Sequence, residues 1–292
     1  MTASEPNTLT IEDYRRFYAE EIRAVANLGQ PALVAAFAGV QREKFLGSPP
    51  WHIAGEMLLK QSDYRATNDA RDIYHNVAVA LKPAQNLNNG QPSTLASWIA
   101  ALDLAENDRV FHVGCGTGYY TAIMAEIVGP TGAIIAAEVD PELATQAAEV
   151  LREYANVTVQ CADGATVDPG SCDAILINAG VTHPHVPWLR RLNDRGRMML
   201  PLTVATRSGL GKGFVVKITH RKDRFAAEVA SMVAIYSSTS VRDSTIEPLL
   251  CKALQSFDLL KLESVRLEAH ERTDECIIHA PAFCLSAASS NA

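Results

Sequence analysis

The stretch from Arg109 to Asp140, RVFHVGCGTGYYTAIMAEIVGPTGAIIAAEVD, decides the fold of this chain. It opens with an apolar run, residues 109–114, which is too brief for a helix and predicts a buried strand. Tyr119–Val128 then repeats apolar residues at helical spacing, and a second apolar run ends at Glu138. The order of strand, glycine turn, helix and strand predicts the repeating unit of an α/β fold.

The turn inside this unit lacks Cβ atoms at alternate positions. Its members are Gly114, Cys115, Gly116, Thr117 and Gly118. A ligand can therefore lie against bare backbone, close to the positive N-terminus of the following helix. Glu138 stands about twenty residues further on, at the tip of the next strand, where a carboxylate can accept both hydroxyls of a ribose. We predict that the unit binds a nucleoside-containing cofactor.

The glycine spacing distinguishes between cofactors. A dinucleotide fingerprint reads G-x-G-x-x-G, whereas this turn reads G-x-G-x-G, and Tyr119 and Tyr120 crowd the place of a diphosphate. The spacing resembles the first motif of class I S-adenosylmethionine-dependent methyltransferases. That resemblance implies S-adenosyl-L-methionine as cofactor, S-adenosyl-L-homocysteine as product, and Tyr119 as a wall of the methionine end. It also implies that Asp163, with Gly164 at the tip of the third strand, accepts from the adenine amino group.

The length, net charge and apolar pattern of the whole chain limit the class of protein to which it can belong. It has 292 residues, which allows one large domain or two. The net charge of −7 argues against a nucleic-acid partner, which would need a basic face. No apolar run approaches the ~18 residues of a membrane span, and the N-terminus lacks a secretion signal. We expect a cytoplasmic protein without a membrane partner.

Six cysteines are scattered without CxxC pairs, at positions 115, 161, 172, 251, 276 and 284. This distribution suits reduced thiols in the cytoplasm. The spacing supports no metal site, so we expect none.

The segments before the cofactor unit are mainly helical. Apolar residues recur at helical spacing over residues 11–27, 31–40 and 93–102. Residues 52–73 fit either a helix or a loop. Residues 83–90 predict a polar loop that ends in the turn pair Asn89-Gly90.

The segments after Glu138 continue the strand and helix alternation. Asp140-Pro141-Glu142 begins a helix that runs to about Tyr154. Strands are predicted at 157–161, 173–179 and 196–200, a helix at 187–192, a turn at 194–196, and a hairpin at 213–219 and 226–235. We expect a mostly parallel α/β sheet with an antiparallel end. Beyond it, residues 245–255 predict a helix, and 264–270 and 275–285 predict two strands.

Several segments together resemble the protein-L-isoaspartate O-methyltransferases. VQREKF at 40–45 is similar to the family's V-P-R-E-x-F signature, with Gln41 in place of proline, and Gln91-Pro92 is similar to its S-Q-P segment. Residues 173–202, DAILINAGVTHPHVPWLRRLNDRGRMMLPL, resemble a third block. The resemblance runs from about residue 12 to 235. It implies a Rossmann-like class I methyltransferase fold, with a mostly parallel seven-stranded sheet and an antiparallel end.

The same resemblance divides the chain into three parts. Residues 1–104 are expected to form an N-terminal helical, substrate-side segment packed on the core, and residues 105–236 the S-adenosylmethionine-binding α/β core. Residues 237–292 form a C-terminal extension. The extension can extend the sheet, cover the site or mediate a homodimer, and the sequence does not choose among these.

The chain departs from the family at positions that the resemblance places beside the isoaspartyl substrate. Counting forward from Tyr74-His75-Asn76, the family's active-site serine falls on Asn88. Counting back from Gln91-Pro92, it falls on Gly90, and neither residue is serine. His75 also stands where the family usually has aspartate. Cofactor binding is therefore better supported than the identity of the acceptor.

Three residues, Asn88, Asn178 and His183, are candidates for the methyl-transfer site. Asn88 to Gln91 form either a lid over the cofactor or a plain surface hairpin. Asn178 either lines the site or satisfies loop backbone. His183, like His185, follows the fourth strand at its C-terminal tip, where ligands bind in open α/β sheets; it serves as a base for a hydroxyl or amine acceptor, or lies on a solvated rim.

The leading interpretation is a methyltransferase that esterifies a carboxylate, such as an isoaspartyl residue of a damaged or modified peptide. A carboxylate is ionised at neutral pH and needs no general base. The alternatives are a methyltransferase of the same fold for a hydroxyl or amine, and a catalytically silent cofactor-binding protein. The acceptor is accordingly a peptide, a protein or a small molecule.

Overall fold

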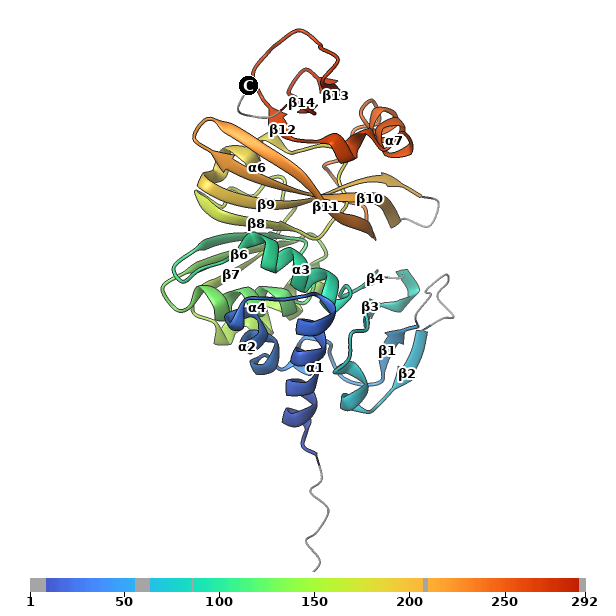
Figure 1. Cartoon of the computed structure of the whole chain (residues 1–292). Coiled ribbons are helices and arrows are strands. Elements are labelled where there is room, and N and C mark those ends of the chain that lie inside the picture. The colour runs from blue at the N-terminus through green and yellow to red at the C-terminus, as the bar shows by residue number, and fades with distance from the viewer. Residues whose placement is uncertain (1–8, 56–63, 86, 207–209, 289–292) are drawn as a thin grey trace, which may run out of the picture.

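One ten-stranded sheet runs through the computed structural model (Figure 1), which describes residues 9–55, 64–85, 87–206 and 210–288. Five strands are parallel, in the order β7 (Val157–Cys161), β6 (Ala133–Glu138), β5 (Arg109–Val113), β8 (Cys172–Ile177) and β9 (Leu192–Ala205). β10 (Leu210–Arg221) and β11 (Arg224–Tyr236) follow as an antiparallel hairpin. These seven strands confirm the predicted class I methyltransferase fold.

The C-terminal extension continues the same sheet. β12 (Ser264–Arg266) pairs with β11, β14 (Phe283–Ser286) pairs with β12, and β13 (Cys276–Ala280) pairs with β14, all antiparallel. Among the three arrangements left open by the sequence, the extension therefore extends the sheet. The predicted strand at 275–285 was wrong as one element, because it divides into β13 and β14 around a turn.

Apolar side chains alternate between the two faces of the sheet and form a core on each. Val110, Ala174 and Met199 belong to one core, whereas their neighbours Phe111 and Ile175 belong to the other. The first face is covered by α1 (Ile11–Val25), α2 (Pro31–Gly39), α3 (Pro92–Leu102), α4 (Tyr119–Val128) and α5 (Pro141–Val150). The second is covered by α6 (Val186–Arg191) and α7 (Glu247–Gln255). Burial on both faces explains why the parallel strands read as continuous apolar runs.

The segment left undecided by the sequence, residues 52–73, is neither a helix nor a plain loop. β1 (Trp51–Ala54) and β2 (Tyr64–Thr67) form an antiparallel pair, and a short 3-10 helix, Ala70–Ile73, follows; residues 56–63 lie outside the described part of the chain. The predicted polar loop at 83–90 contains β4 (Leu87–Asn88), which pairs with β3 (Ala80–Lys82). Short strands carry too few alternating positions to be read from sequence.

The predicted turn at 194–196 lies inside β9. Leu192 pairs with Cys172 and Arg197 pairs with Ala174, so four residues of β9 stand opposite one of β8. Arg195 adopts a positive φ of 65° there. The strand continues on both sides of this bulge, which explains why the sequence placed its start too late.

The N-terminal segment is attached to the core through Arg42, from the VQREKF segment. Its buried guanidinium donates to the backbone carbonyls of Ile73 (2.5 Å), His75 (3.2 Å) and Val77 (2.7 Å). It also lies over the rings of Tyr18 and Tyr119, 5.5 and 5.7 Å from their centres. The arginine therefore holds the chain that leads into β3, and α2 packs on α4 beside it.

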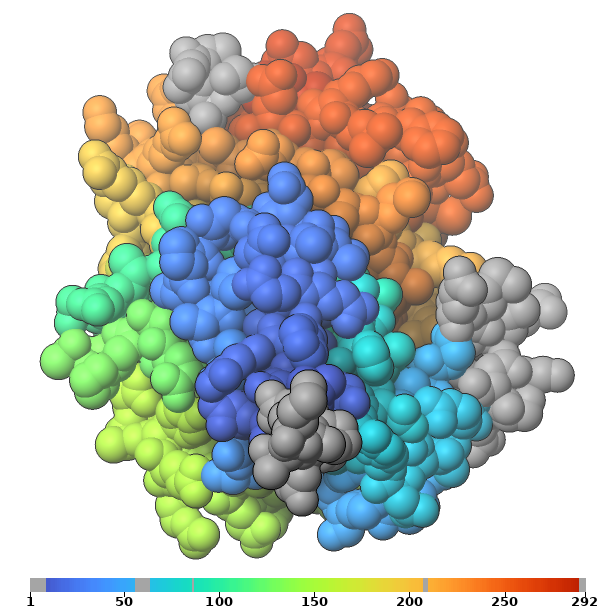
Figure 2. Space-filling view, turned by 60° about the horizontal axis from the view of Figure 1, so that its bottom comes forward, coloured from blue at the N-terminus to red at the C-terminus, as the bar shows by residue number. Residues whose placement is uncertain are grey.

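The two ends of the described chain lie on different parts of the surface. In Figure 2 the N-terminal helices, in blue, occupy the middle of one face, and the C-terminal extension, in red, lies along one end. Among the described helices, none combines the length and the apolar composition that a membrane span requires.

Candidate functional site

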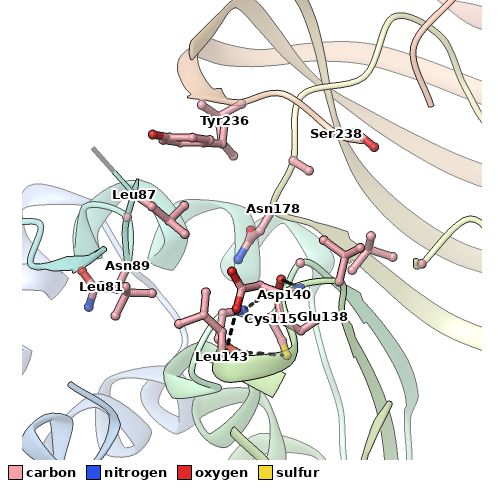
Figure 3. Close-up of a pocket in the computed structure, with 18 of the residues that line it drawn as sticks. Leu81, Leu87, Asn89, Cys115, Glu138, Asp140, Leu143, Asn178, Tyr236 and Ser238 are labelled. Carbon is pink, nitrogen blue, oxygen red and sulfur yellow. Dashed lines mark hydrogen bonds between the residues drawn. The ribbon is translucent and has the colours of Figure 1, made fainter. Parts of the chain in front are cut away.

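A cavity of about 330 Å³ opens at the C-terminal ends of the parallel strands (Figure 3). Its size is within the range of small-molecule sites. Its walls come from the β3–β4 hairpin, the turn after β5, the ends of β6, β7 and β8, and the chain at the end of β11. This is the edge where ligands bind in open α/β sheets.

The glycine turn has the backbone geometry that the sequence predicted. Gly114, Gly116 and Gly118 have positive φ values of 73°, 57° and 92°, which other residues rarely adopt. A Cβ at Gly118 would also lie 2.6 Å from Cδ1 of Leu151. The turn therefore requires glycine for its backbone path as well as for access to it.

Glu138 fixes this turn against the end of β6. Its Oε2 accepts from the backbone N–H of Gly116 at 2.8 Å, and its Oε1 accepts from the N–H of Asp140 at 3.0 Å. The residue is only 8% exposed, yet it lines the cavity. Each oxygen has a further lone pair, so the carboxylate can accept hydrogen bonds from a ligand while it holds the turn.

Most of the residues predicted for the site line this one cavity. They are Asn88, Gly114, Cys115, Gly116, Thr117, Tyr119, Glu138, Asp163, Gly164 and Asn178. Gly118 is not among the lining residues, and it supports the turn as the N-cap of α4.

Gln91 and His183 were also predicted for the site, and neither lines this cavity. Gln91 is exposed at the N-cap of α3. The His183 imidazole is stacked on Phe283 of β14, with ring centres 5.7 Å apart, and its Nδ1 bonds to Thr182 Oγ1 at 2.9 Å. His185 bonds instead to the Ala165 carbonyl at 3.2 Å. His183 therefore contacts the extension, and His185 contacts loop backbone.

Asp163 is bonded on the cavity rim. Its Oδ1 accepts from the Ala165 N–H at 2.9 Å and from Ser240 Oγ at 2.8 Å. The first bond caps the turn after β7, and the second ties the strand tip to the chain after β11. The predicted bond to an adenine amino group would use the remaining acceptor capacity of the carboxylate.

Asn178 is positioned by a buried histidine that the sequence reading missed. Its Nδ2 lies 3.0 Å from Nε2 of His112, and Nδ1 of His112 lies 2.9 Å from Oγ1 of Thr121. Burial lowers the pKa of His112 to about 3, so the ring is neutral at physiological pH. Oδ1 of Asn178 is buried and has no partner among the described residues. A histidine within the apolar run RVFHV was the available signal.

Asn88 and Gly90, the two positions at which the family's active-site serine could fall, both line the cavity. Oδ1 of Asn88 accepts from the N–H of Gly90 at 2.9 Å, and its Nδ2 lies 3.4 Å from the Tyr64 hydroxyl. Gly90 has a φ of 77°, and a Cβ there would lie 2.7 Å from Leu95. Asn88 can therefore present a polar side chain to a substrate, whereas Gly90 is required for the turn.

The chain at the end of β11 forms a wall that the sequence did not predict. Tyr236 and Ser238 lie above the glycine turn, and Leu81 and Leu87 lie to one side (Figure 3). Nζ of Lys82 lies 2.6 Å from Oδ2 of Asp140, a residue that lines the cavity. This ion pair joins the β3–β4 hairpin to the start of α5.

Comparison with known proteins identifies the family. The model of Protein-L-isoaspartate(D-aspartate) O-methyltransferase (PCMT) matches residues 58–229. The chain belongs to this family. A PCMT relative from Nitrosospira multiformis, protein-L-isoaspartate O-methyltransferase 1, is 30% identical over 197 residues, or 65% of this chain and 73% of the relative.

Other PCMT relatives match over a shorter stretch. Protein-L-isoaspartate O-methyltransferase 2 from Archaeoglobus fulgidus is 38% identical over 115 residues, which are 38% of this chain. The chain spans about half the length of this relative and of one from Ignicoccus hospitalis, 52% and 54%.

Solved structures agree on the fold. A protein-L-isoaspartate O-methyltransferase superposes with a TM-score of 0.57 over 82% of this chain and 69% of its own, at 19% identity. A Plasmodium falciparum protein assigned to the same family, solved with S-adenosyl-L-homocysteine, gives 0.58 over 77% and 98%, at 15% identity.

The buried His112 makes the stability of this PCMT member depend on pH. Because its folded pKa lies below the usual 6.5, the unfolded chain binds more protons between about pH 6.5 and 3. Burying His112 as a neutral ring therefore costs no stability above about pH 6.5, and it lowers the free energy of unfolding as the pH falls below that value. As the pH is lowered from 6.5, we expect the free energy of unfolding to fall more steeply for the wild type than for His112→Gln. The two slopes should differ by up to about 1.4 kcal/mol per pH unit. Urea titrations from pH 7.5 to 4 measure this difference, and parallel curves would contradict it.

Proposed function

We propose that this chain is an S-adenosylmethionine-dependent methyltransferase that esterifies a carboxylate of a peptide or protein, isoaspartyl or similar in shape. The observation that carries the proposal is the glycine turn held by Glu138 at the mouth of a ligand-sized cavity, in a chain of the PCMT family. We propose that residues 1–104 form the side of the site that binds the methyl acceptor, and that residues 105–236 form the core that binds the cofactor. Residues 237–292 form an extension that completes the sheet.

The cavity fits the chemistry of the donor. Glu138 offers acceptors to the ribose hydroxyls, and the glycines leave room beside backbone N–H groups for the carboxylate of the methionine moiety. The ammonium group of that moiety needs acceptors, and Oδ1 of Asn178 is an acceptor without a partner among the described residues. Bound there, the donor supplies an electrophilic methyl group on its sulfonium.

The catalytic work of the chain is positioning. Displacement at the methyl group requires the acceptor oxygen in line with the sulfonium, so fixing both partners lowers the barrier. Asn88 and Tyr236 line the cavity, and Lys82 ties the β3–β4 hairpin to the start of α5 through Asp140. We propose that these residues hold the acceptor, with Asn88 in the place of the family's serine.

Among the described residues that line the cavity, the three carboxylates, Glu138, Asp140 and Asp163, are already held by backbone N–H groups or by Lys82, and the thiol and phenol groups are not ionised. Burial raises the pKa values of Cys115, Tyr119 and Tyr120, so these groups stay protonated and uncharged at neutral pH. No histidine lines the cavity in the part of the chain that the structure describes. A carboxylate acceptor needs no proton removal, whereas a hydroxyl or amine usually does. His183, the base of the alternative reading, does not line the cavity, which favours the carboxylate acceptor.

We place the protein in the cytoplasm, because its six cysteines are free thiols in the structure. β13 ends the sheet, so its outer edge is where a second copy would pair should the extension mediate dimerisation.

Cofactor binding depends on the Glu138 charge. We expect Glu138→Gln to weaken the binding of S-adenosyl-L-homocysteine roughly 10- to 150-fold, because charged hydrogen bonds contribute about 1.5–3 kcal/mol. Glu149→Gln, an exposed change on α5, serves as the matched control. Isothermal calorimetry measures both affinities, and equal affinities would remove Glu138 from the binding site.

The product distinguishes the acceptor. With methyl-labelled donor and an isoaspartyl peptide, we expect label that is released by mild base, as a carboxyl methyl ester is. The same peptide with ordinary aspartate is the substrate control, and Gly116→Arg, whose side chain would fill the turn, is the inactive control. Base-stable label would show a different acceptor atom, and an absence of label over a broad panel of acceptors would show a silent cofactor-binding protein.

A further inference from the structure

Four residues of metal-binding type come together in the C-terminal extension, outside the cavity. His270, Cys276, His279 and Cys284 each offer one ligand atom, and these atoms all lie within 4.8 Å of one another. His270 lies between β12 and β13, Cys276 and His279 lie on β13, and Cys284 lies on β14. The two cysteines are buried and the two histidines are partly buried.

The strand register explains the convergence. His279 pairs directly with Cys284 across the hairpin. Residues three apart on a regular strand, such as Cys276 and His279, point to opposite faces. The register shifts between Cys276 and Ile278, and such a bulge re-aims side chains. The spacing His-x5-Cys-x2-His-x4-Cys contains no CxxC pair, and for that reason the sequence did not predict a metal site here.

Neighbouring backbone groups orient two of the four side chains. Nδ1 of His270 lies 2.9 Å from the Glu268 carbonyl, which requires the proton on Nδ1 and leaves Nε2 as an acceptor. That Nε2 lies 3.6 Å from Sγ of Cys276. The Thr273 N–H also donates to this sulfur at 3.4 Å. A carbonyl behind the imidazole is the usual outer shell of a metal site.

The third ligand carries an unsatisfied polar atom. Nδ1 of His279 is buried and makes no hydrogen bond among the described residues. Its ring meets that of His270 edge to face, with centres 4.8 Å apart. A buried polar atom without a partner is unfavourable, and a bound cation within the cluster would relieve it.

We propose that His270, Cys276, His279 and Cys284 bind one Zn²⁺ ion in a closed structural site. Two thiolates and two imidazoles in a tetrahedral arrangement are the ligand set of structural zinc, and two thiolates balance its charge. Four protein ligands leave no position for water or substrate, so the ion holds the fold together and takes no part in methyl transfer.

The site joins three parts of the extension: the connection after β12, β13 and β14. The ion ties the connection that contains His270 to the β13–β14 hairpin at the end of the sheet. Phe283, next to Cys284, stacks on His183 in the loop after β8. Zinc therefore also fixes the contact between the extension and the core. The proposal is independent of the proposed methyltransferase activity.

The test begins with the full-length chain under a reducing agent, loaded with zinc sulfate and freed of excess metal. We expect about one zinc per chain by elemental analysis. Replacement with Co²⁺ is expected to give the visible absorption of tetrahedral cobalt together with thiolate-to-cobalt bands. A reduced chain that retains neither metal would overturn the proposal, as would a Cys276–Cys284 disulfide that persists under the same reducing conditions.

Variants locate the site. Cys276→Ser and Cys284→Ser are expected to weaken zinc binding at least roughly 10-fold, since changes even in the outer shell cost on that order. Cys251→Ser, on α7 and outside the cluster, is the matched control and should keep the zinc affinity of the wild type. If the serine variants fail to fold, His270→Ala, in the connection between strands, takes their place. Wild-type zinc affinity in the folded ligand variants would refute the assignment.

Discussion

The Glu138 carboxylate, bonded to the backbone N–H groups of Gly116 and Asp140, is the interaction on which the site depends. It joins the turn after β5 to the end of β6, so that two neighbouring strand ends become one surface. Positive φ values at Gly114, Gly116 and Gly118 bring the turn into reach of that carboxylate. The same carboxylate keeps free lone pairs on a cavity wall. One side chain therefore both holds the turn and lines the cavity.

Segments far from this pair in sequence complete the cavity. Arg42 binds the chain before β3 through three backbone carbonyls. The ion pair between Lys82 and Asp140 joins the β3–β4 hairpin to the start of α5. From the other side, Ser240 reaches Asp163. The N-terminal part and the chain after β11 thus meet over the same strand ends. The cavity is therefore built from parts of the chain that are far apart in sequence.

The sequence predicted those elements whose signals are local. Helical spacing marked Tyr119–Val128, apolar runs marked the parallel strands, and the glycine turn with Glu138 marked the strand edge that carries the cavity. Features made by contacts between distant residues were missed or misassigned. His183 stacks on Phe283, one hundred residues later, and does not line the cavity. The support of Asn178 by His112 and the wall around Tyr236 depend on tertiary packing. The histidine and cysteine cluster depends on a bulge and a hairpin register, which no spacing rule contains.

The most direct test of the central claim is a crystal structure of the full-length chain grown with S-adenosyl-L-homocysteine. The account predicts an adenosyl group in the cavity, with both ribose hydroxyls on the Glu138 carboxylate and the amino acid end beside Asn178. An empty cavity at saturating ligand, or a ligand bound elsewhere on the surface, would contradict it.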